Sequence, residues 1–318
     1  MSSVTGVGLE PLCRQPAMIE HVRAHNYNTS TRLSAMDSST TDTEQTDQHS
    51  RRAETEPDSA SAESSTDSLA VIADSTYSKA QFIEPTTLGY IHIGAEVQPS
   101  TLPITLFPPS AEKATLLEKL KQQTQQLEEF ETVETATVFK AVTMPPFHRF
   151  PYIKDHIDSL RLAQFDIAIL IETSSPAVVP DVRDTTAYQT LVNTIQSEAT
   201  QMHVMAARNK KRIDTVNKAR DGLFIFNHFV ADDPEVLLEL FDHLAGGYVA
   251  ETGLDNSTLL VPLDEEKADF VAINNAQWDI SRFRFVWREM TNPGLRKYVQ
   301  THLEANQAGS MPVLYRLA

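Results

Sequence analysis

The chain has 318 residues, a hydrophobic fraction of 41% and a formal net charge of −16 at pH 7. This length suffices for two domains, and the acidic charge argues against nucleic acid and anionic membranes as partners. The single cysteine, Cys13, excludes an intrachain disulfide, and no apolar run approaches the about 18 residues of a membrane-spanning helix. The N-terminus also lacks the order of a secretory signal. We therefore expect a cytoplasmic protein.

Residues 1–80 are predicted to form a disordered acidic head. Residues 37–68 are almost entirely Ser, Thr, Asp, Glu, Gln and Ala, and they include no aromatic residue. Such a segment cannot bury enough apolar surface to offset its conformational entropy. Its composition fits both a regulatory tail and an idle solubilising extension.

Residues 85–216 form the first predicted domain, in the order strand, helix, strand, strand, helix, strand. Apolar runs predict its strands, and apolar residues at steps of three and four predict its helices. The expected elements are a strand at 88–97, a helix from the Ser110 cap to about 130, strands at 136–144 and 165–173, a helix at about 185–208 and a strand at 212–216. A Pro- and aromatic-rich insertion, 145–164, separates the central strands. The basic run 208–212 is expected at the end of the second helix, where it complements the helix dipole.

Residues 217–318 form the second predicted domain and repeat the same order more clearly. Asp233 before Pro234 predicts a helix start, and Gly253 predicts its end. The expected elements are a strand at 223–231, a helix at 234–251, strands at 258–263 and 270–278, a helix at 292–306 and a strand at 312–317. The Gly246–Gly247 pair inside the first of these helices is expected to permit close helix packing.

The repeated order predicts an α+β protein with two ferredoxin-like βαββαβ halves. The helices of one half cover only one face of its sheet, so the other apolar face must pack on something. Two such halves close against each other into an α/β barrel. We expect a sheltered space between the two sheets.

Several stretches of the sequence resemble the dimeric α/β-barrel superfamily. They are FIFNHFVADD, ETGLDNSTLLVPL, INNAQWD and the ending MPVLYRLA. With MPPFHRF and FDIAILIET upstream, residues 85–318 resemble uncharacterised tandem-barrel members of that superfamily. The resemblance implies the fold but no single reaction, because the superfamily includes cofactor-independent monooxygenases of the antibiotic-biosynthesis type, haem-degrading monooxygenases, haem peroxidases and members with no known activity.

Asn227, Asn274 and Trp278 are the candidate catalytic residues. Asn227 is a polar residue within an apolar strand, and it is expected to orient a ligand or oxygen inside the barrel cavity. Asn274 and Trp278 are four residues apart and so lie on one face of their strand. The resemblance to the antibiotic-type monooxygenases implies that such a pair binds an aromatic substrate. The alternatives are a satisfied structural asparagine, a turn residue and a core tryptophan.

His228, Arg149 and Glu172 are candidate ligand-binding residues. His228 follows Asn227 and faces the other side of the sheet, Arg149 lies in the insertion and fits a ligand carboxylate, and Glu172 near a strand end is a general base if desolvated. Structural histidine, loop and solvated-carboxylate roles are the alternatives. We predict no metal, because none of the histidines expected in the folded part, His228, His243 and His302, forms a His-x3-His pair, and no HExxH pattern is present.

The leading functional hypothesis is a barrel that binds a small organic molecule, such as a cofactor-independent monooxygenase acting on an aromatic or polyketide-like compound. The second hypothesis is a non-catalytic, self-associating structural or regulatory barrel, and a homodimer is expected under either. The third is a haem-binding barrel, since the resemblance implies haem as an alternative cofactor. In some haem-binding relatives the last helix, which here carries His302, supplies an axial ligand.

Overall fold

The computed structural model describes residues 73–99, 108–279 and 292–318. Residues 1–72, which hold Cys13 and most of the predicted disordered head, lie outside the described residues, and so does the side chain of Arg149. The remaining elements form one compact unit.

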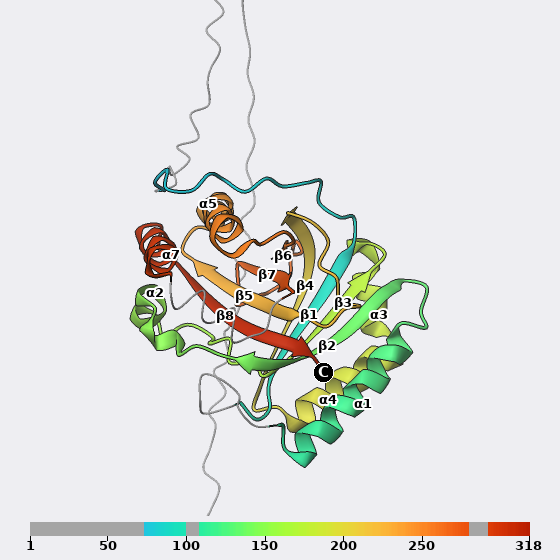
Figure 1. The fold of residues 1–318 in the computed structure, drawn as a ribbon. Helices are drawn as coiled ribbons and strands as arrows, with labels where there is room; N and C mark the ends of the chain where they lie inside the picture. Colours follow the sequence, from blue (N-terminus) through green and yellow to red (C-terminus); the bar gives the residue numbers. More distant parts are fainter. Residues whose placement is uncertain (1–72, 100–107, 280–291) are drawn as a thin grey trace, which may run out of the picture. The chain divides into compact units, whose positions relative to one another are not determined.

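Eight antiparallel strands form a closed barrel in the order β1-β3-β2-β8-β5-β7-β6-β4 (Figure 1). β1 to β4 give the order β4-β1-β3-β2, and β5 to β8 give the matching order β8-β5-β7-β6. This repeat confirms the two ferredoxin-like halves that close into one α/β barrel. The strands are β1 (Gly89–Glu96), β2 (Val133–Thr143), β3 (Ile167–Thr173), β4 (Gln201–Arg212), β5 (Leu223–Ala231), β6 (Thr258–Pro262), β7 (Ala272–Trp278) and β8 (Ala308–Leu317).

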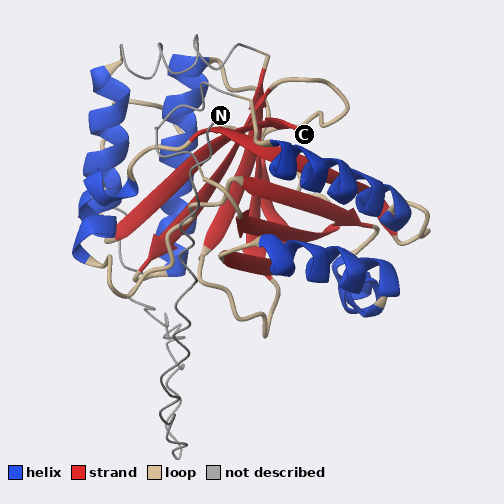
Figure 2. Ribbon diagram, turned by 90° about the horizontal axis from the view of Figure 1, so that it is seen from below, coloured by secondary structure: helices blue, strands red, loops and turns tan. Residues whose placement is uncertain are grey.

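Helices cover the outside of the barrel on two sides (Figure 2). α1 and α4 cover the sheet of the first half, and α5 and α7 cover that of the second. The helices are α1 (Ala111–Leu127), α2 (Pro151–Asp155), α3 (Val179–Asp184), α4 (Thr186–Glu198), α5 (Pro234–Thr252) and α7 (Pro293–Ala305), with short 3-10 turns η1 (Phe147–Arg149) and η2 (Pro176–Val178). Within the described ranges, none of these helices has the length and apolar character needed to cross a bilayer.

The predicted starts of α1 and α5 and the predicted end of α5 are confirmed. Ser110 caps α1 by accepting a hydrogen bond from the amide of Lys113, and Asp233 caps α5 ahead of Pro234. Gly253 ends α5 in the left-handed region, with a φ of 70°.

The prediction of one helix over 185–208 is wrong in its second part. α4 ends at Glu198, and β4 starts at Gln201. Residues of β4 alternate between the two faces, because His203 and Met205 point into the barrel while Val204 packs towards the helices. The basic run therefore lies on a strand, where Arg208 pairs with Asp264 and Lys211 pairs with Asp242.

Large side chains fill the barrel interior. One buried cluster draws residues from all eight strands, including Tyr90, Phe139, Phe226 and Tyr315. The Tyr315 hydroxyl donates a 2.7 Å hydrogen bond to the carbonyl of Phe165 and so joins the two halves. The expected sheltered space between the sheets is therefore absent from the described interior, because aromatic and aliphatic side chains occupy it.

Residues 74–84 form a strap that runs over the outer side of α5 and α7 (Figure 1). The Tyr77 ring packs edge-on against Tyr298 at a centroid distance of 4.8 Å, and its hydroxyl donates to Glu251. The amide of Ala80 donates to the carbonyl of Asp242. The predicted disorder is thus wrong for residues 74–80, which dock through contacts that their polar composition did not indicate.

Candidate functional site

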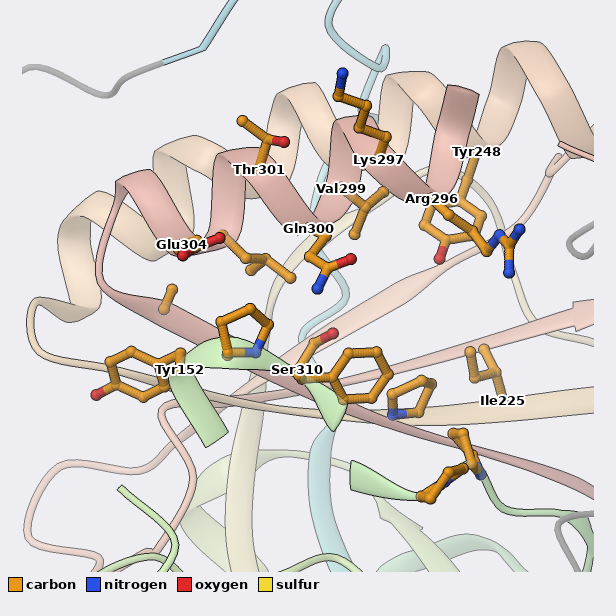
Figure 3. Close-up of a pocket in the computed structure, with 18 of the residues that line it drawn as sticks. Tyr152, Ile225, Tyr248, Arg296, Lys297, Val299, Gln300, Thr301, Glu304 and Ser310 are labelled. Atoms are coloured by element: carbon orange, nitrogen blue, oxygen red, sulfur yellow. The ribbon is translucent and has the colours of Figure 1, made fainter. Parts of the chain in front are cut away.

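A cavity of about 630 Å³ lies outside the barrel, in the second half. Its floor is the outward face of β8 with Ile225 of β5, and α7 forms the opposite wall (Figure 3). The insertion between β2 and β3 closes one side through Pro145, Pro146 and Phe150 and through Pro151 and Tyr152 of α2. The lining residues include Thr143, Pro145, Pro146, Phe150, Pro151, Tyr152, Ile225, Tyr248, Pro293, Arg296, Gln300, Glu304, Ser310, Pro312 and Leu314.

The alternation of β8 explains why the cavity forms on this face. Val313 and Tyr315 point into the barrel, whereas Ser310, Pro312 and Leu314 point outwards to the cavity. Gly309 lies against Tyr152 and Ile153, where an added Cβ would lie 2.8 and 2.7 Å from their side chains. The absence of a side chain at this position lets α2 pack close to β8 and shape the cavity wall.

A recess of about 30 Å³ adjoins the cavity beneath α5. The cavity and the recess share Ile225, Tyr248, Val299 and Ser310 as lining residues. The recess has room for about one or two water-sized groups. Apolar side chains of α5, namely Phe241, Leu244 and Ala245, form one wall, and residues of β5 and β7 form another.

The recess brings together Asn227, Asn274 and Trp278, the three residues predicted as catalytic. Asn227 on β5 and Asn274 on β7 are direct partners in the antiparallel register, and Trp278 lies on the same face as Asn274. Their location differs from the prediction, because they face the helices and not the barrel interior. The sequence indicated the shared face of Asn274 and Trp278, but not which face that was.

The polar atoms of the recess are only partly satisfied. The Asn274 Oδ1 accepts a 2.6 Å hydrogen bond from the Ser257 hydroxyl, and the Trp278 Nε1 donates to the Thr252 hydroxyl at 3.2 Å. Asn227 is 9% exposed, and its Oδ1 has no hydrogen-bond partner. A buried amide without its full set of partners is costly unless another group supplies them. The recess therefore offers a polar contact to a ligand.

The other candidates lie apart from this site. His228 points into the barrel, where its Nδ1 lies 3.4 Å from the Met311 carbonyl. Glu172 accepts hydrogen bonds from Thr135 at 2.6 Å and from Lys218 at 3.0 Å, so both of its oxygens are engaged. Arg149 belongs to η1, next to residues that line the cavity, and its side chain is not described. No sequence pattern indicated Gln300 and Ser310, which face each other across the cavity (Figure 3).

His228 is one of three histidines inside the barrel. Its ring lies 5.2 Å from that of His92 and 4.9 Å from that of Phe270, which also contacts His203. Burial lowers the pKa of His228 to about 3 and that of His203 to about 4, and it lowers the pKa of His92 well below its usual value. All three imidazoles are therefore neutral near pH 7.

The residues of the site do not fit a histidine-ligated haem. No histidine lines the cavity or the recess within the described part of the chain. The His302 Nδ1 lies 2.6 Å from the Tyr298 carbonyl, and its Nε2 accepts a hydrogen bond from the amide of Asp74, so both nitrogens already have partners. Among the described residues, no group of three or more His, Cys, Asp or Glu side chains is placed to hold a metal ion.

No family model and no curated protein sequence matches the chain. A solved structure named as an anthrone oxidase-like protein has a TM-score of 0.51 and 15% identity, covering 75% of this chain and 94% of that one. A candidate monooxygenase from Lactobacillus acidophilus NCFM has a TM-score of 0.40 and 10% identity, covering 72% and 94%. Another from Fusobacterium nucleatum subsp. nucleatum ATCC 25586 has a TM-score of 0.44 and 8% identity, covering 72% and 91%.

The likeness to the anthrone oxidase-like structure extends over most of both chains and concerns the fold alone. Together with the strand order, it defines the fold class. The chain has the ferredoxin-like fold of the dimeric α/β barrels, with both halves in one polypeptide. The fold that the sequence resemblance implied is thereby confirmed.

Proposed function

We propose that this protein binds a small, mostly apolar organic molecule in the cavity between α7 and β8. The observation that carries this proposal is the adjoining recess, where Asn227, Asn274 and Trp278 come together beside a chamber of about 630 Å³. Ligand sites are typically concave and mostly apolar, with a few polar groups that fix the orientation of the ligand. This cavity has that composition, and the packed barrel interior does not.

The reaction that we propose is cofactor-independent monooxygenation of an aromatic or polyketide-like compound. In such a reaction the substrate itself supplies the electrons. One oxygen atom of O2 replaces two hydrogens of a substrate methylene to give a carbonyl, and the other leaves as water with those hydrogens. The recess would hold the reacting edge of the substrate, with the Asn227 amide and the Trp278 ring as positioning groups.

Anthrone, whose central methylene becomes the second carbonyl of anthraquinone, is a suitable test compound. We expect the full-length protein to accelerate oxygen uptake and anthraquinone formation over the protein-free rate. Asn274→Ala and Trp278→Phe should each lower kcat/KM at least about tenfold, the effect of losing about 1.4 kcal/mol of transition-state binding. Their melting temperatures should stay within a few degrees of the wild type. Asn193→Ala, an exposed position on α4 in the other half, is the matched control.

The outcomes separate binding from catalysis. If anthraquinone binds, as measured by calorimetry, but oxygen uptake equals the protein-free rate, the monooxygenase proposal fails and the non-catalytic binding barrel remains. If both recess variants bind and react as the wild type does, the recess is not the site.

A further inference from the structure

The cavity wall carries opposite charges at its two ends. Of the two described cations that line it, Arg296 lies at one end of the cavity, whereas the side chain of Lys297 points away from it (Figure 3). Arg296, Gln300 and Glu304 are spaced by four residues on α7, so they follow one line along the helix. At a rise of about 1.5 Å per residue, Arg296 and Glu304 are separated by about 12 Å along the helix axis. Figure 3 shows Arg296 beside Tyr248 at one end of the cavity and Glu304 at the other.

Rigid rings line much of the rest of the cavity. Five prolines line it, at positions 145, 146, 151, 293 and 312, together with the rings of Phe150, Tyr152 and Tyr248. Proline and aromatic rings present planar faces with little conformational freedom to lose, and aromatic faces stack on planar ligands. A planar ring system is the ligand shape that such walls favour.

We propose that the cavity selects planar aromatic molecules that carry a carboxylate, and that Arg296 receives this carboxylate. The inference rests on the proposed function and names the chemical class of its ligand. A guanidinium stays charged and matches a carboxylate through two parallel N–H donors. Its five N–H groups allow Arg296 to keep a contact within the protein while it binds a ligand.

The charge of the whole chain makes a local cation necessary. A net charge of −16 repels anions from the molecule, so an anionic ligand needs a positive group within the site itself. Glu304 repels a carboxylate from the opposite end of the cavity. The two charges together orient the ligand with its carboxylate towards Arg296 and away from Glu304.

Calorimetric titration of the full-length protein with 2-naphthoate and with its uncharged counterpart 2-naphthamide tests the inference. In low salt we expect naphthoate to bind about tenfold more tightly, within the range of a charge-assisted hydrogen bond. Arg296→Gln should remove this preference and leave naphthamide binding unchanged. Lys154→Gln removes the same charge from an exposed position on α2 that does not line the cavity, and it should keep the preference.

Salt supplies a second measurement that needs no variant. Raising NaCl from about 20 to 300 mM should weaken naphthoate binding and leave naphthamide binding nearly constant, because salt screens exposed charges. Equal affinities for the two probes in the wild type, or a naphthoate preference that survives Arg296→Gln, would overturn the inference while cavity binding stands. If neither probe binds at millimolar concentration, the proposed function fails and the inference fails with it.

Discussion

Three neutral histidines in an aromatic interior are an unusual feature at the scale of single residues. His92, His203 and His228 are at most 5% exposed, and five of their six ring nitrogens have no hydrogen-bond partner. Three charged groups lie near His203, namely Asp269, Arg161 and Glu266, and the Asp269 carboxylate lies 4.0 Å from the His203 Nε2. His92 and His228 face one another and His203. These imidazoles act as aromatic packing groups that keep the ability to take up protons.

The depressed pKa values of these histidines predict that the protein loses stability as the pH falls. In the unfolded chain a histidine titrates near pH 6.5, so below that pH the unfolded state binds protons that the folded state refuses. The neutral histidines therefore contribute their full share to the free energy of unfolding above about pH 6.5. This contribution is lost progressively as the pH falls towards 4. Between pH 7 and pH 5 each histidine should remove about 2 kcal/mol from the free energy of unfolding, which urea titrations at the two pH values measure.

Variants of single histidines separate this effect from acid titration elsewhere. His228→Phe, which suits the aromatic surroundings, should reduce the loss between pH 7 and pH 5 by about 2 kcal/mol. His148→Gln, at an exposed position of η1, should leave the loss unchanged. An identical loss in the His228 variant and the wild type would show that the buried cluster does not govern acid stability.

Residue patterns in the sequence indicated the composition of the recess but not its place in the fold. Spacing by an even number puts Asn274 and Trp278 on one face of a strand, and the strand register then brings Asn227 beside them. The closure of the barrel decides which face of a strand points into the interior and which points to the helices. Alternation of residue types cannot decide this when both faces of the strand are buried. Gln300 and Ser310 gave no signal because polar residues on a helix and a strand are ordinary surface residues until a third segment covers them.

At the scale of elements, the strap depends on the absence of a side chain at Gly246. A Cβ at this position would lie 1.9 Å from the carbonyl oxygen of Ser78. The prediction that the glycine pair permits close helix packing holds at Gly247, where an added Cβ would lie 3.0 Å from Leu295 of α7, whereas at Gly246 the close neighbour is the strap. Phe82 extends the same docking by packing against Phe241, with Lys211 above its ring.

Gly246→Ala should therefore destabilise the protein, although a glycine within a helix is normally improved by alanine. The change raises helix propensity by about 1 kcal/mol, but displacement of the strap should cost about 1–3 kcal/mol. The expected result is a lower melting temperature and faster proteolysis of residues 74–84. Gly247→Ala is the matched control, since its Cβ would meet only the side chains of Leu295 and Tyr77, at 3.0 and 3.2 Å. A Gly246 variant as stable as the wild type would contradict this account of the strap.

The element that the sequence predicted least well is β4. The apolar residues within 201–208 continue the helical spacing of the segment before them. The same residues also fit the alternating pattern of a strand. Pairing with β1 on one side and with β6 on the other decides in favour of the strand. A local sequence pattern cannot predict this strand pairing, because β6 lies about 50 residues further along the chain.

At the scale of the whole molecule, two seams hold the barrel closed. β2 pairs with β8 and β4 pairs with β6, so each seam joins a strand of one half to a strand of the other. Side chains add to these seams, since Arg183 of α3 donates to both oxygens of Glu266, at 3.0 and 2.7 Å. The sequence predicted two halves and their closure, because each half leaves one apolar face uncovered. Whether the complete chain also forms a homodimer stays a prediction.

Because both halves share one interior, we expect the full chain to unfold in a single transition. Phe226 of the second half packs against Phe139 of the first, and the Tyr315 hydroxyl bonds to the first half at Phe165. Unfolding of either half would expose this aromatic interface and two unpaired strand edges. Calorimetry should therefore give equal calorimetric and van't Hoff enthalpies for the barrel.

The isolated second half, residues 217–318, gives the complementary test. Without its partner it would expose Phe224, Phe226 and Tyr315 on one sheet face, together with the free edges of β6 and β8. An open sheet with an apolar face lowers its free energy by pairing with a second copy, since the copies supply each other with the missing edges. Size-exclusion chromatography with light scattering on the fragment should give a mass of at least two copies. A monomeric fragment with native-like circular dichroism, or two separate transitions in the full chain, would mean that each half is stable without the shared interior.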